Sequence, residues 1–273
     1  MLFLQKSKTM TNGVVNQSLA ALRKEPFERS EMVSQLLFGE AFTILERFKG
    51  WIRISTLPDG YEGWIDEKLC VLLEKEQECL FNPTVHTVSN QLFLAKSDAE
   101  EFPLRLCPGS SLFYYDSISG SFSIGESNYI SLNQPVEQLD GSPRELLVKL
   151  AQNYINSPYL WGGRSPYGID CSGLVQILFK QIGINIPRDA GQQVNFGETV
   201  DFINMAKPGD VAFFDDEEGS IVHVGIIYPQ GKIIHASGYV RVDFIDHQGI
   251  FSQNKQKYTH KLRVVKNLID GLT

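Results

Sequence analysis

The chain has 273 residues, 42% of them hydrophobic and 21% charged, which is typical of a folded protein of about two domains. Its formal net charge is −7 and no basic cluster occurs, which argues against a nucleic-acid or anionic-membrane partner. No run of about 18 apolar residues occurs, so we expect no membrane-spanning helix and no membrane partner.

The N-terminal segment MLFLQKSKTM has only a short apolar run before two lysines. A secretory signal would need about 7–15 apolar residues and a small-residue cleavage site. The four cysteines, Cys70, Cys79, Cys107 and Cys171, match neither a zinc motif nor a disulfide framework. We therefore expect reduced thiols and a cytoplasmic location. We also expect a monomer, with neither a metal nor a cofactor.

Residues 1–75 have the pattern of a small β-barrel. The β-prone segments LAALRKEP, EAFTILERF and WIRISTL are separated by turns at FGE, KG and PDG. The segment GYEGWI, from Gly60 to Ile65, then places two aromatic residues around glycines, on a turn that leads into a strand.

Residues 76–138 repeat this pattern less clearly. The segment LCPGSSLFYYDSISGSFSIGE has Pro-Gly and Ser-Gly turns between apolar stretches, and it is an approximate counterpart of LLFGEAFTILERFKGWIRIS. We interpret it as a second, weaker copy of the barrel. The alternative is an irregular β extension of the first domain.

A new domain, residues 139–273, begins near Ser142. The segment Ser142-Pro-Arg-Glu is a capping box with proline at the first helical position, and apolar residues follow at helical spacing up to Ile155. A second helix is predicted to start at or beside Cys171 and to end at Gly183. The strand-like segments DVAFF, HVGIIY, KIIHAS and KLRVV come next, so helices followed by antiparallel strands predict an α+β fold.

Cys171 stands in PYGIDCSGL, between polar residues and glycines, where a buried packing cysteine would have aliphatic neighbours. The N–H groups and the dipole at a helix N-terminus favour the thiolate, so we expect a thiol pKa near neutrality or below. The same N–H groups could stabilise an oxyanion. The position alone indicates either a nucleophile or an inert cysteine beside a helix cap.

A nucleophilic cysteine needs a base and a group that orients the base. His86, His247 and His260 lie in turn-rich or polar contexts without a strand pattern. His223 opens HVGIIY and His235 ends KIIHAS, and a three-residue hairpin loop, PQG, would bring both imidazoles to one face, one diagonal step apart. Two half-buried strand histidines without a catalytic role are the alternative.

Together, YLWGGRSPYGIDCSGLV, IPRDAGQQ, KPGDVAFF, HVGIIY and IIHASG resemble the NlpC-type cysteine peptidases of bacterial peptidoglycan, from about Ser142 to the C-terminus. The resemblance implies a papain-like core with Cys171 as nucleophile, His223 as general base and acid, and His235 as the orienting residue. The N-terminal half, through LLFGEAF and GYEGWI, resembles the bacterial SH3-type domains that precede such catalytic domains.

The resemblance also implies the substrate. The family cleaves the bond between γ-D-glutamate and a diamino acid, meso-diaminopimelate or L-lysine, and relatives with this layout bind small muropeptides whose free N-terminal L-alanine fits against the SH3-type domain. The residues that would contact the peptide are Tyr61, Glu31, Trp161, Asp170, Ser172, Arg188 and Asp189.

Within that set, Arg188 would fork onto the glutamyl carboxylate and Asp189 would hold the alanyl amine, since a guanidinium suits a carboxylate and a carboxylate suits an ammonium. A surface ion pair is the alternative interpretation. The chain departs from its relatives at two points: Ala190 stands where they often have serine, and Glu31 is the nearest candidate for a glutamate that they carry near Val33.

The sequence therefore predicts a cytoplasmic γ-D-glutamyl-L-diamino acid endopeptidase of cell-wall recycling. An exported hydrolase of intact peptidoglycan would need a signal that this sequence lacks. A papain-like acyltransferase is disfavoured by the absence of a membrane segment or a basic amphipathic helix. A non-enzymatic wall-binding module is disfavoured because Cys171, His223 and His235 are all present.

Overall fold

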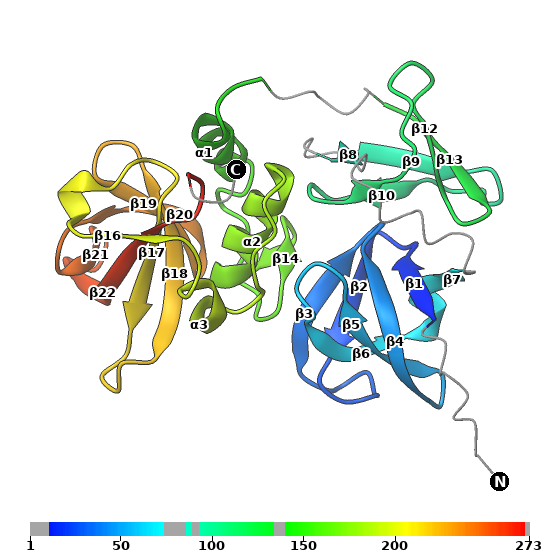
Figure 1. Cartoon of the computed structure of the whole chain (residues 1–273), viewed down its shortest axis with the longest axis horizontal. Coiled ribbons are helices and arrows are strands. Elements are labelled where there is room, and N and C mark those ends of the chain that lie inside the picture. The colour runs from blue at the N-terminus through cyan, green and yellow to red at the C-terminus, as the bar shows by residue number, and fades with distance from the viewer. Residues whose placement is uncertain (1–10, 74–85, 89–92, 134–139, 271–273) are drawn as a thin grey trace, which may run out of the picture.

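The computed structural model describes residues 11–73, 86–88, 93–133 and 140–270, which form three lobes (Figure 1). The N-terminal lobe is a β-barrel, and the middle lobe is a smaller β structure beside it. The C-terminal lobe combines helices with a large antiparallel sheet. Among the described residues, no helix is both long and apolar enough to span a bilayer.

The barrel confirms the prediction of short strands separated by tight turns. Its sheet order is β3-β2-β6-β5-β4-β1-β7, with every pairing antiparallel. Alternate residues such as Leu22, Phe42 and Ile54 form its core. The strands are β1 (Asn12–Val15), β2 (Leu19–Arg23), β3 (Met32–Leu37), β4 (Ala41–Phe48), β5 (Trp51–Thr56), β6 (Glu62–Asp66) and β7 (Cys70–Leu73), with a 3₁₀ turn η1 (Glu67–Leu69) before β7.

The middle lobe contains a four-stranded sheet, β10-β9-β13-β12, and a two-stranded sheet, β11-β8. Phe38 of the barrel packs edge-on against Phe122 and Tyr129, so the two lobes share a core. That this lobe copies the barrel stays a prediction, and the predicted boundaries near residues 75 and 138 lie outside the described residues. The strands are β8 (His86–Thr87), β9 (Phe93–Ser97), β10 (Leu104–Leu106), β11 (Ser111–Leu112), β12 (Ser121–Ile124) and β13 (Ser127–Ser131).

The C-terminal lobe is an α+β domain, as predicted. Its main sheet has the order β16-β22-β17-β18-β19-β20-β21, and β21 also pairs with β22. Its helices are α1 (Pro143–Gln152), α2 (Cys171–Gln181), α3 (Ala190–Gln193) and η3 (Ile203–Met205). Its strands are β14 (Arg164–Ser165), β15 (Gly168–Ile169), β16 (Glu198–Val200), β17 (Val211–Asp215), β18 (Ile221–Tyr228), β19 (Lys232–Ser237), β20 (Tyr239–Ile245), β21 (Gly249–Ser252) and β22 (Lys257–Asn267).

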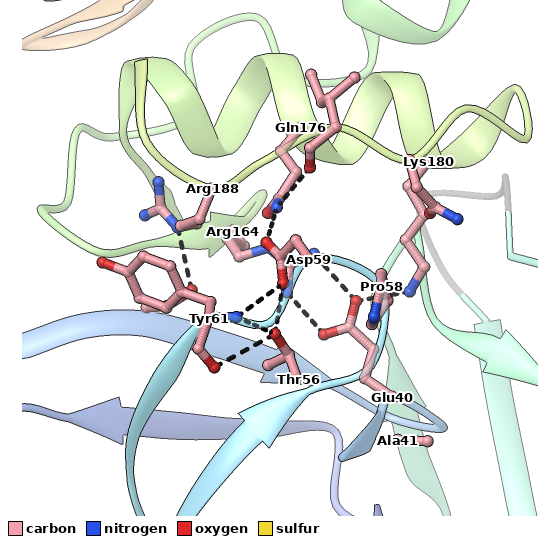
Figure 2. A pocket seen from close by; sticks show the side chains of 13 residues that line it. Glu40, Ala41, Thr56, Pro58, Asp59, Tyr61, Arg164, Gln176, Lys180 and Arg188 are labelled. Carbon is pink, nitrogen blue, oxygen red and sulfur yellow. Dashed lines mark hydrogen bonds and ion pairs between the residues drawn. The ribbon is translucent and has the colours of Figure 1, made fainter. Parts of the chain in front are cut away.

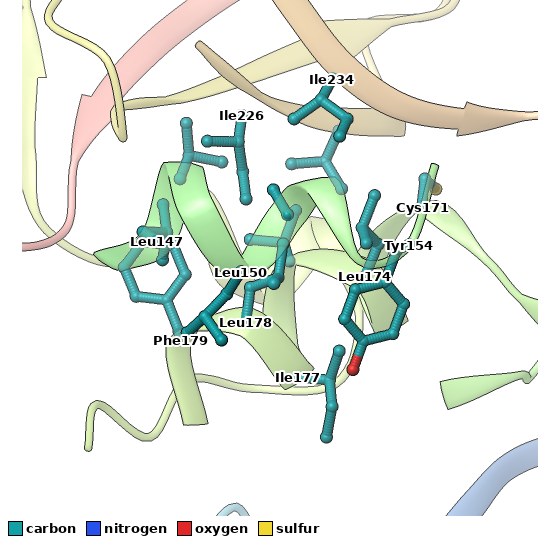
Figure 3. Packing of buried hydrophobic residues seen from close by; sticks show 14 of the residues in the cluster. Leu147, Leu150, Tyr154, Cys171, Leu174, Ile177, Leu178, Phe179, Ile226 and Ile234 are labelled. Carbon is teal, nitrogen blue, oxygen red and sulfur yellow. The ribbon is translucent and has the colours of Figure 1, made fainter. Parts of the chain in front are cut away.

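Both predicted helices form where their signals lie. The Ser142 hydroxyl and the Glu145 carboxylate make the reciprocal capping box of α1, and Gly183, with a φ of 83°, follows the end of α2. Leu150 of α1 and Leu174 of α2 belong to one buried cluster that covers the sheet (Figure 3). This packing holds the first residue of α2 against strands β18 and β19.

The N-terminal half also contributes to the catalytic core. Leu37 at the end of β3 and Cys107 of the middle lobe belong to the same buried cluster as Ile177 of α2. Gly109 has a φ of 91°, and a Cβ atom at this position would lie 2.3 Å from Cδ1 of Ile177. The chain can therefore approach α2 at this point only as glycine.

Candidate active site

Cys171 is the first residue of α2, and the residue before it fixes the start of the helix. The Asp170 carboxylate accepts a hydrogen bond from the backbone N–H of Gly173 at 2.7 Å, which caps the helix. The backbone N–H groups of Val224 and Ser172 donate to the sulfur. The sulfur therefore lies against β18, next to Val224, the residue that follows His223.

Burial reverses the predicted effect of the helix N-terminus on this thiol. Loss of hydration, followed by the charge of Asp170, raises the pKa of Cys171 to about 11, although the two backbone donors act in the opposite direction. The expected pKa near neutrality is therefore wrong for the unliganded protein, because only 9% of the residue is exposed. The thiol keeps its proton until a neighbouring base accepts it.

The two predicted histidines meet as the hairpin register requires. Tyr228 pairs with Lys232 and Ile226 with Ile234, so the three-residue loop is as predicted. Nε2 of His223 lies 2.8 Å from Nδ1 of His235, and both residues are buried. Burial lowers the pKa of both imidazoles, that of His223 well below its usual value, so both rings are neutral near neutral pH.

Asp243 extends this pair into a relay that the sequence reasoning missed. Its Oδ2 lies 3.0 Å from Nε2 of His235 and accepts from Nε of Arg241 at 2.8 Å. Burial would raise the pKa of Asp243, but His235 and Arg241 outweigh it and lower that pKa, so the carboxylate is ionised. An ionised acceptor places a proton on Nε2 of His235 and leaves its Nδ1 to accept from Nε2–H of His223. Nδ1 of His223 is then the basic nitrogen.

The sequence held a signal for Asp243. In the structure His235 pairs with Arg241 and Ile233 with Asp243, which makes Asp243 a diagonal neighbour of His235 on the same face. The same diagonal rule that joined the two histidines would have found it if a turn had been predicted at Gly238, whose φ is 76°.

His260 contradicts its expected context. The sequence around it shows no strand pattern, but His260 belongs to β22, and its ring stacks on that of His223 with the centroids 4.2 Å apart. The alternation of buried and exposed residues along β22 is hard to recognise, because most of its residues are partly exposed and its pairings with β17 and β21 are irregular. Burial lowers the pKa of His260 to about 4, so it adds no charge beside the base near neutral pH.

The nitrogen atoms of these three histidines lie within 4.8 Å of one another, close enough to consider a metal. A zinc site requires three lone pairs that converge on one point about 2.0–2.1 Å from each nitrogen. Here His223 and His235 share a proton across a hydrogen bond, and the rings of His223 and His260 are nearly parallel, at 24°. The cluster is arranged for proton transfer better than for metal ligation.

A cleft of about 430 Å³ lies over Cys171, and it contains every residue predicted to contact the peptide. Four segments of the catalytic domain line it, around α2, α3, Trp161 and the start of β18. The barrel lines the remaining side. The predicted residues in its wall are Glu31, Tyr61, Trp161, Asp170, Ser172, Arg188 and Asp189, joined by Val33, Tyr159, Ala190, Gly191, Ile221 and Val222.

Asp170 and Arg188 are already paired with each other at the floor of this cleft. The guanidinium of Arg188 contacts both carboxylate oxygens of Asp170, donates to the Ser172 hydroxyl, and reaches Ser34 of the barrel at 3.0 Å. Asp170 also accepts from the backbone N–H of Gly162 at 2.8 Å. The pair therefore supports the nucleophile, and a contact of Arg188 with a substrate carboxylate stays a prediction.

Two side chains from the barrel contact two from the catalytic domain across the cleft. The Tyr61 hydroxyl donates to Oδ1 of Asp189 at 3.4 Å, and the Trp161 indole N–H donates to Oε1 of Glu31 at 3.0 Å. Burial and the charge of Asp189 raise the pKa of Tyr61 to about 12, which keeps the phenol protonated. Carboxylates at positions 31 and 189 thus both line the cleft, one from the barrel and one from the catalytic domain.

Two family models match the chain in these regions. The NlpC/P60 family model matches residues 156–263, and the model of the bacterial dipeptidyl-peptidase SH3 domain matches residues 22–68. The gamma-D-glutamyl-L-lysine dipeptidyl-peptidase of Bacillus subtilis is 31% identical over 221 residues, which cover 74% of this chain and 71% of that protein. The chain belongs to the NlpC/P60 family. The predicted class, a cysteine peptidase with an SH3-like barrel before it, is confirmed.

Two further similar proteins match over most of the chain. Dipeptidyl-peptidase 6 of Lysinibacillus sphaericus is 28% identical over 262 residues, which cover 87% of this chain and 93% of that protein. The crystal structure of an NlpC/P60 family protein from Bacillus cereus superposes with a TM-score of 0.78 at 19% identity, covering 94% of this chain and 99% of that chain. The second similarity shows a common fold that includes the N-terminal lobes.

Proposed function

We propose that this NlpC/P60 peptidase hydrolyses the amide bond between γ-D-glutamate and the following diamino acid, L-lysine or meso-diaminopimelate, in short peptidoglycan peptides with a free N-terminal L-alanine. The observation that carries the proposal is the barrel wall of the cleft, where Tyr61 and Glu31 face the catalytic domain close to Cys171. The name of the Bacillus subtilis relative, a gamma-D-glutamyl-L-lysine dipeptidyl-peptidase, supports the choice of bond.

The relay supports acyl transfer through a thioester. His223 accepts the thiol proton while the sulfur of Cys171 attacks the γ-carbonyl carbon, and the N–H groups at the start of α2 face the developing oxyanion. His223 then donates this proton to the nitrogen of the departing diamino acid, and the C–N bond breaks. Water, deprotonated by His223, attacks the thioester and releases the dipeptide acid, and the proton returns to the sulfur.

The barrel end of the cleft suits an ammonium group. Asp189 and Glu31 bring two carboxylates to it, and Arg188, the one cationic side chain among the described residues of the wall, is already paired with Asp170. Loss of hydration raises the pKa of Asp189, so a bound ammonium ion would offset the cost of keeping this carboxylate charged. A wall that recognises a chain end also blocks continuation of the peptide beyond it.

A blocked cleft favours small soluble fragments over the intact wall polymer. We therefore place the reaction in cell-wall recycling in the cytoplasm, with the protein acting as a monomer on released muropeptides.

The test compares kcat/KM for L-Ala-γ-D-Glu-L-Lys with that for its N-acetyl form. Loss of a buried charge pair costs about 2–5 kcal/mol, so acetylation should lower kcat/KM roughly 30-fold or more. Asp189→Asn should lower activity on the free peptide without raising it on the acetylated one, whereas Asp201→Asn, an exposed control, should change neither. Similar values for the two peptides, or ready digestion of intact sacculi, would instead indicate an exported wall hydrolase.

A further inference from the structure

Helix α2 carries the nucleophile at its N-terminus and contacts the barrel along its side (Figure 2). Gln176 and Lys180 are four residues apart and so lie on one face of the helix. Nε2 of Gln176 donates to Oδ2 of Asp59 at 2.8 Å, and Nζ of Lys180 donates to Oε1 of Glu40 at 2.6 Å. Both acceptors belong to the barrel, so one rigid element joins the reacting sulfur to the barrel.

Glu40 is the centre of this contact. Its carboxylate is buried and accepts two hydrogen bonds from the Arg164 guanidinium, at 2.6 and 3.0 Å, in addition to the bond from Lys180. It also accepts from the backbone N–H of Leu37 at 3.0 Å. Burial alone would raise the pKa of Glu40, but Arg164 and Lys180 outweigh it and lower that pKa to about 2. The carboxylate is therefore charged at all ordinary pH values.

The second contact leads directly to the cleft. Asp59 accepts from the Thr56 hydroxyl and from the backbone N–H of Tyr61, so the loop before β6 is tied to the side chain that Gln176 holds. The Tyr61 hydroxyl at the far side of this loop reaches Asp189. The loop is thus fixed at one end by α2 and at the other by the wall of the cleft.

We propose that Glu40 is a positioning residue that sets the length of peptide the cleft accepts. Through Arg164 and Lys180 it seats the barrel on α2, and this fixes the space between the sulfur of Cys171 and the barrel wall at Tyr61. Under the proposed function, that space holds the two residues on the N-terminal side of the scissile bond. The inference rests on the proposed function, since it concerns how the same cleft excludes longer peptides.

The central variant is Glu40→Gln, which keeps the side-chain shape and an acceptor for Leu37 but removes the charge. Its matched control is Glu46→Gln, which removes a carboxylate of the same barrel that pairs with Arg53 at the surface. Each protein is assayed for kcat and KM on L-Ala-γ-D-Glu-L-Lys and on the same peptide with one extra N-terminal glycine. Thermal unfolding is measured in parallel.

Wild type and Glu46→Gln should both prefer the tripeptide strongly. Breaking a buried ion pair is strongly destabilising, so Glu40→Gln should weaken the contact between the barrel and α2. The preference for the tripeptide should therefore fall about tenfold. The loss should come mainly from a higher KM for the tripeptide and readier cleavage of the extended peptide, with kcat for the tripeptide little changed. Lys180→Met removes the partner on the helix, leaves the Glu40–Arg164 pair balanced, and should act in the same direction if Glu40→Gln does not fold.

Two outcomes separate this inference from the proposed function. If wild type prefers the tripeptide and Glu40→Gln or Lys180→Met keeps the full preference with only a lower melting temperature, Glu40 merely stabilises the protein and the positioning role is overturned. If wild type itself cleaves both peptides equally well, the proposed function and the length selection both fail.

Discussion

Replacing Asp243 tests the proton relay at its outer end, where no contact with substrate is expected. Asp243→Asn keeps an oxygen that can accept from both His235 and Arg241, and Arg241, which can only donate, holds the amide in that orientation. The tautomer of His235 is then preserved, and the variant loses only the negative charge. Asp243→Ala removes the acceptor altogether and leaves the His235 tautomer unconstrained.

The size of the effect follows from the bond that is lost. A hydrogen bond to a charged group contributes about 1.5–3 kcal/mol, which corresponds to about 10- to 150-fold in rate. We therefore expect kcat to fall about tenfold in Asp243→Asn and towards 100-fold in Asp243→Ala, because the alanine variant also frees the wrong tautomer. KM should stay near the wild-type value in both variants, since Asp243 does not line the cleft.

The assay is steady-state hydrolysis of L-Ala-γ-D-Glu-L-Lys, with kcat and KM determined separately between pH 5 and 9. Asp246→Asn is the control, because Asp246 hydrogen bonds with Tyr258 at the surface, away from the histidines. If both Asp243 variants retain wild-type kcat, the relay does not set the protonation of His223. A raised KM at unchanged kcat would instead assign Asp243 to binding.

Three further predictions follow from the site and its support. Cys171→Ala should abolish turnover, whereas Cys107→Ala should lower stability and leave the reaction in place, as product release from the tripeptide and a thermal melt would show. His223→Ala should lower kcat more than His235→Asn, because an orienting residue is partly replaceable; equal losses would give His235 a more direct role. The pKa of Glu40 is lowered from 4.5 to about 2, which stabilises the folded protein by about 3 kcal/mol. This stabilisation is fully present above about pH 4.5 and is lost as the pH falls towards 2. Glu40→Gln should therefore show a smaller drop in melting temperature between pH 6 and pH 3 than wild type, and an equal drop would mean that Glu40 is not ionised in the folded protein.

Local signals in the sequence were sufficient for the centre of the site. The capping box at Ser142 and the polar residues around Cys171 determine where two helices begin, because both depend on neighbours within three or four residues. The hairpin between β18 and β19 has a short loop, so its register could be counted and the contact of His223 with His235 predicted.

Contacts between segments far apart in the sequence could not be predicted in this way. The pairing of Glu40 with Arg164 joins residues 124 positions apart, and although each lies in a recognisable segment, nothing in either segment indicates that the two meet. The prediction of a low thiol pKa for Cys171 was wrong for a related reason. The start of the helix can be recognised in the sequence, but the packing that removes water from the thiol cannot. His260 was missed because β22 is irregular and mostly polar, so its position beside His223 depends on the closure of the sheet.

The packing of Leu37, Cys107 and Gly109 around Ile177 bears on how the chain reaches its native state. The N-terminal lobes are synthesised first and carry part of the apolar lining that α2 needs, so the catalytic domain cannot complete its interior by itself. Cutting the chain before Ser142 would expose this lining on both fragments and promote aggregation. Folding thus depends on the lobes acting as one cooperative unit, and the intact chain should melt in a single calorimetric transition.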